Sequence, residues 1–339
     1  MNSLPELFLT RLQEILPAEK YQNGLKSFSK TDLLVVRVNT LKISKEKILE
    51  ILKNLNIQCA WIPEVRDALR LENITLRELQ ETEIFKSGLV YCQNLSSMLP
   101  VMALDPGPGE RVLDMCAAPG SKTTQIAAFM KNEGSIMAIE AIKDRYYRLK
   151  SVVDSMGVKI VSMRLMDARR FRPLISHDRR TFSREHSPSR HHREFSQNQD
   201  LLFDRILLDA PCSSEGRFKT NDPKTYRYWS LRKIEEMVRK QRGLLLNASR
   251  WLKPGGVLVY STCSFAPEEN EGVLNWLFKK TQGKLISMPI SFPKIETYPA
   301  ITRWKGKIFD PQITNCVRVL PDEKMEGFFI AKLVLGREP

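Results

Sequence analysis

Two cysteines occupy positions where a protein can use a thiol as a nucleophile. Cys212 and Cys263 each follow closely on an apolar stretch that is typical of a buried strand, and both have small polar neighbours. Asp209 ends the first of these stretches. A single buried thiol is more often a small apolar filler, but a position just past a strand end favours a reactive group. The pair are therefore candidates for covalent catalysis.

A second chemical feature is the stretch 111–123, which predicts a buried strand, a tight turn and the start of a helix. In α/β proteins such turns bind nucleotide-like ligands, because backbone N–H groups at a helix start are unpaired. The turn has a single glycine, Gly120, so it fits neither a dinucleotide fingerprint nor a P-loop. The stretch therefore predicts a nucleoside-type cofactor without a pyrophosphate.

Acidic residues follow the next two expected strands. Glu140 ends the strand expected at 136–139, where its carboxylate can accept hydrogen bonds from ribose hydroxyls. Asp167 follows the strand expected near 158–165, where it can reach the base of a nucleoside or simply form a turn. Both readings of Asp167 remain open at this level.

The elements that must position these residues alternate between strand and helix patterns, which predicts an α/β fold with a doubly wound sheet. Ligand chemistry in such a sheet sits at the carboxyl ends of the strands, so Asp209, Cys212, Cys263 and the cofactor turn should share one rim. Residues 1–85 predict a small α+β module and residues 86–339 the main domain. In the module, Arg37, Asn39 and Lys42 could contact phosphate or ribose, or form a solvated turn and helix cap.

Composition limits the class of protein. The chain has 339 residues, a net charge of +14 and no apolar run long enough to span a membrane. Its basic character favours a polyanionic partner such as nucleic acid. Six cysteines without a C-x-x-C pair indicate neither a zinc site nor a disulfide framework, so we expect a cytoplasmic protein and no metal.

Residues 169–200 interrupt the alternation with a basic insert. It holds many arginines and all four histidines of the chain, with few apolar residues, which predicts disorder or ordering only on a polyanion. A metal site made of these histidines is not expected without a rigid frame. A mechanism that needs a positioned histidine base is also disfavoured.

A nucleoside-type cofactor, two thiols and an aspartate on a basic protein together favour alkylation of a nucleobase. Carbon 5 of cytosine is a poor nucleophile until a thiolate adds at carbon 6, which converts the ring to an enamine. An acid near N3 would stabilise the charge that develops there. A base must later take the proton from carbon 5 before the thiol leaves.

Several motifs resemble the NOL1/NOP2/Sun family of RNA cytosine-5 methyltransferases. They are DMCAAPGSKTTQ at 114–125, DAPCS at 209–213, YSTCS at 260–264 with EEN at 268–270, and EGFFIAK at 326–332. The stretch RVNTLK at 37–42 is similar to the N-terminal motif of the family. The resemblance covers nearly the whole chain except the basic insert, and it is strongest to the bacterial enzymes that modify small-subunit ribosomal RNA.

The resemblance implies a class I, Rossmann-like methyltransferase that uses S-adenosylmethionine. It also implies Cys263 as the nucleophile on carbon 6, Cys212 as the thiol that assists product release, and a catalytic role for Asp209. The implied cofactor-binding residues are Cys116, Ala117, Ala118, Pro119, Gly120, Ser121, Lys122, Glu140, Asp167 and Asp209.

The expected function is therefore methylation of cytosine carbon 5 in RNA, with ribosomal RNA favoured over tRNA and the residues 1–85 acting as an RNA-binding module. No membrane association and no obligate protein partner are expected. Two rivals remain: a DNA cytosine-5 methyltransferase, and a non-catalytic RNA-binding assembly factor with the same fold. The order of the two thiols and the motif at 37–42 argue against the DNA methyltransferase. The intact thiol pair argues against the non-catalytic assembly factor.

Overall fold

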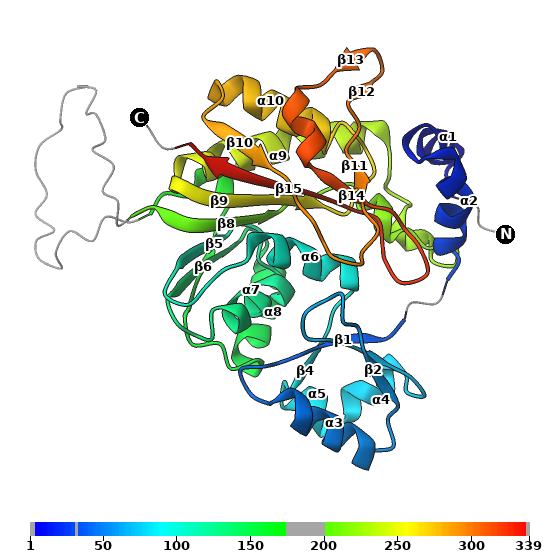
Figure 1. The fold of residues 1–339 in the computed structure, drawn as a ribbon, viewed down its shortest axis with the longest axis vertical. Coiled ribbons are helices and arrows are strands. Elements are labelled where there is room, and N and C mark those ends of the chain that lie inside the picture. Colours follow the sequence, from blue (N-terminus) through cyan, green and yellow to red (C-terminus); the bar gives the residue numbers. More distant parts are fainter. Residues whose placement is uncertain (1–3, 31–32, 174–200, 337–339) are drawn as a thin grey trace, which may run out of the picture.

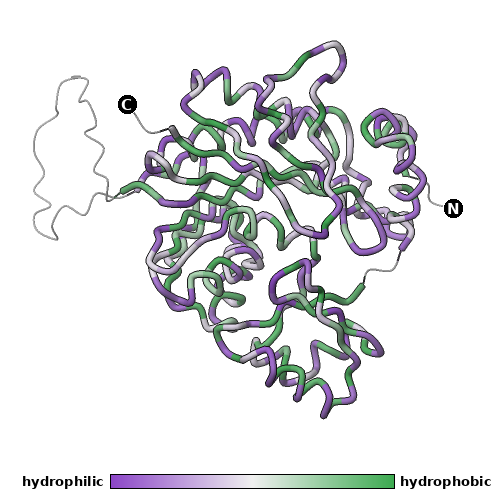
Figure 2. Tube along the Cα trace, viewed as in Figure 1, coloured by the Kyte–Doolittle hydropathy of each residue, from purple (hydrophilic) through white to green (hydrophobic). Residues whose placement is uncertain are grey.

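The computed structural model describes residues 4–30, 33–173 and 201–336, and its largest element is a mixed nine-stranded sheet (Figure 1). Its strand order is β11-β14-β15-β9-β8-β5-β6-β7, with β10 paired to β15. The parallel half consists of β5 (Arg111–Asp114), β6 (Ser135–Glu140), β7 (Val161–Leu165), β8 (Phe203–Asp209) and β9 (Leu252–Thr262). These strands are apolar because helices cover both faces, and the tube in Figure 2 is largely hydrophobic there.

The strand order changes direction beside β5, which lies between β6 and β8. This is the switch point at which an open parallel sheet leaves a crevice for a ligand. The antiparallel half closes the other edge and comprises β10 (Leu285–Met288), β11 (Tyr298–Pro299), β14 (Val317–Val319) and β15 (Phe328–Leu335). The sequence patterns at 316–320 and 327–335 predict a closing antiparallel pair of strands, and the structure confirms it as β14 and β15.

Five helices pack with this sheet: α6 (Leu95–Leu104), α7 (Ser121–Phe129), α8 (Lys143–Ser155), α9 (Leu231–Arg250) and α10 (Glu271–Thr281). The side chain of Ser230 caps α9 by accepting a hydrogen bond from the Lys233 N–H. The pattern at 267–279 predicts a helix with Glu268, Glu269 and Glu271 in its first turns. The helix begins later, at Glu271, so the placement of Glu268 and Glu269 in it is wrong. Both side chains instead hydrogen-bond outside that helix.

A four-stranded antiparallel sheet with the order β2-β3-β1-β4 lies below the large sheet in Figure 1. It contains β1 (Val35–Val38), β2 (Cys59–Trp61), β3 (Ala68–Leu71) and β4 (Val90–Cys92), together with α3 (Lys45–Asn54), α4 (Leu76–Glu81) and α5 (Glu83–Lys86). A capping box formed by Thr75 and Glu78 begins α4. Because β4 pairs with β1, this sheet continues past residue 85.

The first two helices, α1 (Glu6–Ile15) and α2 (Ala18–Ser27), lie beside the large sheet and not on the small one (Figure 1). Phe8 packs against Phe218 with ring centroids 4.8 Å apart, and Phe28 packs edge-on against Phe265 at 6.3 Å. Arg11 forms an ion pair with Glu268 at 2.7 Å. The N-terminal helices therefore complete the core of the larger part of the chain.

The remaining short elements are connectors: η1 (Ala168–Arg170), η3 (Glu215–Arg217), η4 (Pro223–Thr225), η5 (Pro311–Asn315) and the hairpin of β12 (Arg303–Trp304) and β13 (Lys307–Ile308). Most of the basic insert expected at 169–200, including its four histidines, lies outside the described residues. None of the helices that the structure describes combines the length and apolar composition needed to cross a membrane.

Candidate active site

The turn between β5 and α7 forms one wall of a large cavity with a volume of about 900 Å³. Gly120, which ends the turn, has a φ of +111°, and a β-carbon there would lie 3.0 Å from Cγ1 of Val152. The turn therefore requires glycine both for its backbone conformation and for its close approach to α8. The cavity is lined by most of the expected cofactor turn: Cys116, Ala117, Ala118, Pro119, Ser121 and Lys122.

Asp114, at the end of β5, has a buried carboxylate oxygen that is free to accept a hydrogen bond. Oδ2 accepts from the hydroxyl of Thr123 at 2.7 Å, whereas Oδ1 has no partner among the described residues. Burial raises the pKa of Asp114 to about 6. Asp114 does not line the cavity, so its open acceptor lies buried behind the turn.

Glu140 ends β6, and only one of its two carboxylate oxygens accepts hydrogen bonds from the described residues. Its Oε1 accepts hydrogen bonds from the N–H groups of Ala141 and Ile142, both at 2.9 Å. Its Oε2 lies 3.7 Å from Nη1 of Arg145, whose Nη2 donates to the carbonyl of Ala118 at 2.6 Å. The arrangement leaves Oε2 able to accept hydrogen bonds from a diol. Arg145, which also lines the cavity, was not singled out from the sequence.

Asp167 does not line this cavity. It caps the short helix η1, accepting a hydrogen bond from the N–H of Arg169 at 2.9 Å. The guanidinium of Arg169 also binds both carboxylate oxygens, and this hydrogen bonding lowers the pKa of Asp167. The described residues thus use Asp167 as a turn-forming residue, and its contact with a base stays a prediction.

The two candidate thiols lie side by side. Cys212 follows β8 and Cys263 follows β9. These strands are parallel neighbours, and Asp209 of β8 is paired with Ser261 of β9. Their Sγ atoms are 3.3 Å apart, and both thiols are free. Cys263 lines the cavity that the cofactor turn also lines. The rim expected from the strand ends therefore brings both thiols to one place.

The contact between the thiols shifts their pKa values in opposite directions. A hydrogen bond from the Cys212 thiol lowers the pKa of Cys263, and the positive charge of Arg217 acts in the same direction against the effect of burial. The same hydrogen bond and burial raise the pKa of Cys212. Cys263 is therefore the thiol that ionises first and Cys212 the one that keeps its proton.

Asp209 and Lys122 join the cofactor turn to the thiol rim. Lys122 Nζ lies 2.7 Å from Asp209 Oδ2 and donates to Ser97 Oγ at 2.7 Å. Asp209 Oδ1 accepts from the hydroxyl of Ser261 at 2.7 Å. Both ends of the ion pair line the cavity. The sequence indicated both residues, but their pairing was missed because they are far apart along the chain.

Arg37 and Asn39 are not surface contacts for phosphate or ribose, as one reading of the sequence proposed. Arg37 is 2% exposed and donates to the Ser121 carbonyl at 3.0 Å and to Thr124 Oγ1 at 2.7 Å. Asn39 Nδ2 donates to the carbonyls of Gly88 and Met156. The polar side chains of this motif thus connect the small sheet to α7 and to the end of α8.

Lys42 completes this fastening, with Nζ donating to the carbonyls of Ser87 at 2.8 Å and Ser155 at 2.6 Å. One of its two acceptors lies just before β4 of the small sheet and the other at the end of α8, as is also true of Asn39. Residues 40–42 do form the expected turn, in which the N–H of Leu41 donates to Asn39 Oδ1 at 3.2 Å, but neither reading of the motif included the bonds to Ser87 and Ser155. Sequence patterns carry no signal for bonds whose acceptors are distant backbone carbonyls.

A switch-point turn, a thiol pair and a lysine–aspartate pair on this sheet define a Rossmann-like methyltransferase that depends on S-adenosylmethionine. Residues 101–334 match the family model described as 16S rRNA methyltransferase RsmB/F, and residues 4–75 match that of its ferredoxin-like domain. This chain belongs to that family of RNA methyltransferases. The match confirms the resemblance to NOL1/NOP2/Sun enzymes.

Two relatives illustrate the range of the family. The tRNA (cytosine(49)-C(5))-methyltransferase of Pyrococcus abyssi is 36% identical over 300 residues, which are 88% of this chain and 86% of that enzyme. The ribosomal RNA small subunit methyltransferase F of Escherichia coli O139:H28 is 35% identical over 336 residues, 97% of this chain and 63% of that protein. The chain thus spans less than two thirds of the second relative.

Solved structures agree with the fold. A methyltransferase homolog protein from Pyrococcus horikoshii superposes with a TM-score of 0.77 at 31% identity, covering 98% of this chain and 95% of that one. NSun6 from the same organism, solved with SFG, has a TM-score of 0.77 at 24% identity, covering 99% of this chain and all of that one. The expected fold class, a Rossmann-like methyltransferase with a small N-terminal domain, is confirmed.

Proposed function

We propose that this chain methylates carbon 5 of cytosine in RNA through a covalent bond between Cys263 and carbon 6 of the base. The observation that carries the proposal is the pair of free thiols, Cys212 and Cys263, with sulfur atoms 3.3 Å apart beside the cavity of the cofactor turn. A second thiol in contact with the first has no use in a methyl transfer to an already nucleophilic atom. It suits a reaction in which the first thiol must add and later leave.

S-adenosylmethionine supplies the methyl group when it is bound. The residues that would hold it are the turn 116–122 and Asp209 at the cavity, and Glu140, which does not line the cavity but lies 3.7 Å from the cavity-lining Arg145. Glu140 Oε2 suits the ribose diol. Asp167 would contribute only by exchanging Arg169 for the base of the cofactor.

In the addition step, the thiolate of Cys263 forms a bond to carbon 6 of the flipped cytosine. The base must leave its stack to reach a thiol inside a cavity, which costs least in loops. N3 takes up a proton as the ring becomes an enamine. Asp209 would deliver it as the neutral acid, after the Lys122 ammonium 2.7 Å away has given that proton to its carboxylate, and Ser261 orients the carboxyl group. Carbon 5 of the enamine would then take the methyl group from the sulfonium of bound S-adenosylmethionine, whose S–CH3 bond breaks to leave S-adenosylhomocysteine.

In the elimination step, carbon 5 loses its proton to a base, and the electron pair of that bond restores the double bond between carbons 5 and 6. The bond between carbon 6 and Cys263 breaks, and N3 releases its proton. Cys212, 3.3 Å away, can hydrogen-bond the departing sulfur. The higher pKa of the Cys212 thiol keeps a proton available for that bond.

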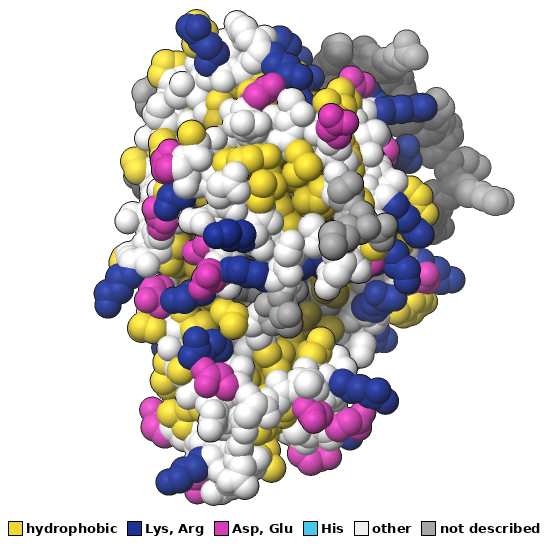
Figure 3. All heavy atoms as spheres, turned by 90° about the vertical axis from the view of Figure 1, so that its right-hand side faces the viewer, with side chains coloured by type: hydrophobic (Ala, Val, Ile, Leu, Met, Phe, Trp, Pro, Cys, Tyr) yellow, Lys and Arg dark blue, Asp and Glu magenta, His cyan; other side chains and the backbone are white. Residues whose placement is uncertain are grey.

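The RNA is proposed to be small-subunit ribosomal RNA, in line with the family match over 101–334. A tRNA is the second candidate, because the tRNA enzyme of Pyrococcus abyssi matches this chain over most of its own length. Figure 3 shows Lys and Arg side chains spread over one face with acidic ones between them, so no single basic patch on that face selects either RNA.

The module of residues 1–85 is proposed to bind RNA next to the reacting base. Leu33, Leu71, Asn73 and Thr75 from this module line the same cavity as Cys263. An RNA strand that places a cytosine at Cys263 would therefore contact the small sheet. The match of residues 4–75 to the ferredoxin-like domain of RsmF/B-like proteins supports a shared role for this module.

The test is methyl transfer from labelled S-adenosylmethionine to small-subunit ribosomal RNA, bulk tRNA and duplex DNA by the purified protein. Label on carbon 5 of cytosine in RNA is expected, and label in DNA alone would overturn the proposal. Bisulfite sequencing of ribosomal RNA and tRNA from a deletion strain then identifies the modified cytosine. Unchanged methylation in that strain, together with no transfer in vitro, would favour the non-catalytic assembly factor.

A further inference from the structure

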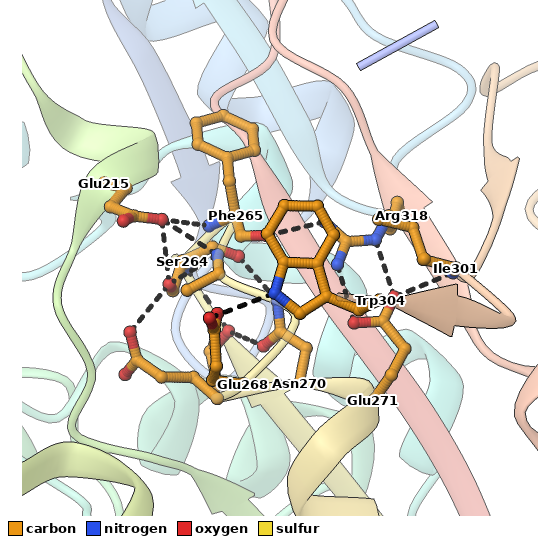
Figure 4. Close-up of polar contacts among 12 residues, drawn as sticks. Glu215, Ser264, Phe265, Glu268, Asn270, Glu271, Ile301, Trp304 and Arg318 are labelled. Carbon is orange, nitrogen blue, oxygen red and sulfur yellow. Dashed lines mark hydrogen bonds and ion pairs between the residues drawn. The ribbon is translucent and has the colours of Figure 1, made fainter. Parts of the chain in front are cut away.

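The loop that follows Cys263 is held by a buried carboxylate from another segment. Glu215, at the start of η3, is 1% exposed. Its Oε2 accepts hydrogen bonds from the backbone N–H groups of Phe265 and Ala266, both at 2.9 Å, and its Oε1 accepts from the indole N–H of Trp229 at 2.8 Å. Figure 4 shows the carboxylate facing the backbone of this loop. Three N–H donors offset much of the cost of burying the charge.

A second buried carboxylate reaches across in the opposite direction. Glu269 belongs to the segment that follows Cys263, and its Oε2 accepts from the N–H of Ser213, next to Cys212, at 3.0 Å. Gln241 Nε2 donates to the same oxygen at 2.8 Å. The hydroxyl of Ser264 lies between the two carboxylates, 3.1 Å from Glu215 Oε2 and 2.8 Å from Glu269 Oε1.

The backbone of the two thiol segments is also joined directly. The N–H of Gly216 donates to the carbonyl of Cys263 at 2.8 Å. A β-carbon at Gly216 would lie 3.1 Å from the carbonyl oxygen of Cys263 and 2.3 Å from that of Gly327, the residue before β15, so no side chain fits at this position. Each thiol segment is thus tied to the other within a few residues of its sulfur.

A further group of bonds fixes the outer side of the Cys263 loop (Figure 4). Asn270 Nδ2 donates to the Ser264 carbonyl at 2.8 Å, and Arg318 Nη1 donates to the Phe265 carbonyl at 3.0 Å. Arg318 is itself held by Glu271 in a two-pronged ion pair at 2.6 and 2.7 Å. These bonds brace the loop from outside but do not reach the Cys212 segment. In the part of the chain that the structure describes, Glu215 and Glu269 are the two carboxylates that cross between the thiol segments.

We propose that Glu215 and Glu269 are positioning residues for the two-thiol reaction, each carboxylate binding backbone N–H groups of the segment that carries the opposite thiol. This inference rests on the proposed function, because it assigns the sulfur-to-sulfur contact to this reciprocal clamp. The clamp holds Cys212 where it can bond the Cys263 sulfur before addition and during elimination. Displacement of a reacting group by about 1 Å can cost about a hundredfold in rate, so a loosened clamp should lower turnover more than binding.

The test compares Glu215→Gln and Glu215→Asp with a matched control, Glu268→Gln. The Gln amide would face its N–H₂ toward an N–H donor, and Asp is one methylene too short to reach the loop. Glu268 precedes Glu269 and also accepts from an indole N–H, that of Trp304 at 3.0 Å, and from Arg11, but its carboxylate binds no group of the Cys212 segment. Thermal unfolding establishes that each variant is folded.

The first measurement is the rate of Cys263 alkylation by iodoacetamide without RNA or cofactor, followed by mass spectrometry of the Cys263 peptide. Both Glu215 variants are expected to slow it about tenfold through loss of the ordered thiol contact, and Glu268→Gln to change it less than about twofold. The second is methyl transfer to transcribed small-subunit ribosomal RNA. There kcat should fall about a hundredfold in the Glu215 variants, with KM for RNA and cofactor within about twofold of wild type.

Folded Glu215 variants with wild-type alkylation and kcat would overturn the proposal, as would a rise in KM at unchanged kcat or an equal loss in Glu268→Gln. Failure of both Glu215 variants to fold would assign the residue to the fold and also count against it. If wild-type protein transfers no methyl group to RNA while the alkylation rates still separate, the clamp stands and the proposed function fails.

Discussion

The Sγ atoms of Cys212 and Cys263 lie 3.3 Å apart at the carboxyl ends of two neighbouring parallel strands. A hydrogen bond from the first thiol lowers the pKa of the second. In the reaction proposed above, this difference in pKa supports addition by Cys263 and assistance of its release by Cys212.

The first prediction concerns a trapped intermediate. Cys212→Ala should accumulate a covalent RNA adduct that survives denaturation, because Cys263 still adds but leaves slowly. Cys263→Ala should form no adduct and lose at least about a thousandfold in methyl transfer. Gel electrophoresis of labelled RNA under denaturing conditions measures the adduct. Methylation by Cys263→Ala would show that the assignment of the two thiols is wrong.

The second prediction concerns oxidation. Because the two sulfur atoms are already in contact, the two-electron oxidant diamide should convert both thiols to a disulfide, with diamide reduced to its hydrazine. Activity should be lost and should return with dithiothreitol. Peptide mapping identifies the bond, and Cys59→Ala, which changes a cysteine of β2, is the control that should respond like wild type. A linkage from Cys263 to any other cysteine would contradict the observed pairing.

The third prediction tests whether Arg37 supports the cofactor turn or contacts RNA phosphate. Arg37→Met keeps most of the side-chain volume but removes the bonds to Ser121 and Thr124, so the free energy of unfolding should fall by roughly 1–3 kcal/mol. The KM for S-adenosylmethionine should rise, because Ser121 belongs to the cofactor turn. Urea unfolding and steady-state kinetics measure the two effects.

The salt dependence of RNA binding completes that test. A residue that contacts phosphate changes the slope of log affinity against log salt by about 1 when it is removed. Arg37 is buried, so the salt slope of RNA binding by Arg37→Met should match that of wild type. Arg70→Met, on the adjacent strand β3, is a control for the general effect of losing an arginine from this sheet. A reduced slope in Arg37→Met alone would restore the phosphate-contact reading.

The fourth prediction follows from Glu269, whose pKa is raised to about 7 by burial and by the nearby charge of Glu215. A carboxyl with a raised pKa in the folded state contributes stability at low pH, and that stability is lost as pH rises through about 7. Between pH 5 and pH 8 the wild type should therefore lose up to about 3 kcal/mol that Glu269→Gln does not lose, at about 1.4 kcal/mol per pKa unit.

Guanidinium unfolding at a series of pH values measures this difference. The comparison is between slopes and not absolute stabilities, because Gln also loses a hydrogen bond to Ser213 or Gln241. Asp114, with a pKa of about 6, titrates in the same window and is common to both proteins. Parallel profiles for wild type and Glu269→Gln would contradict the raised pKa.

Much of the fold and the rim of the site could be predicted because the physics is local or follows a general rule. A lone Gly120 between a strand and a helix indicates the turn, and the rule for parallel strand ends brings Asp209, Cys212 and Cys263 together. These predictions need only the order of the elements. They do not depend on which side chains touch.

The remainder depends on contacts that no local pattern records. Lys122 binds Asp209 across the switch point, and Arg37 binds the backbone of α7 from another sheet. The helix expected at 267–279 placed Glu269 in its first turns, where an acid suits the helix dipole, but its carboxylate accepts from the N–H of Ser213 and the helix begins at Glu271. In each case a tertiary bond outweighs the local preference.

The packing of the N-terminal helices has a consequence for how this chain can be divided. Phe8 and Phe28 fill the core beneath Phe218 and Phe265, and Arg11 neutralises Glu268. A fragment truncated before residue 86 would uncover aromatic surface next to the thiol loops and leave that acid unpaired. The first helices thus belong to the catalytic half in folding although they precede the small sheet in sequence, and limited proteolysis should release no active C-terminal fragment.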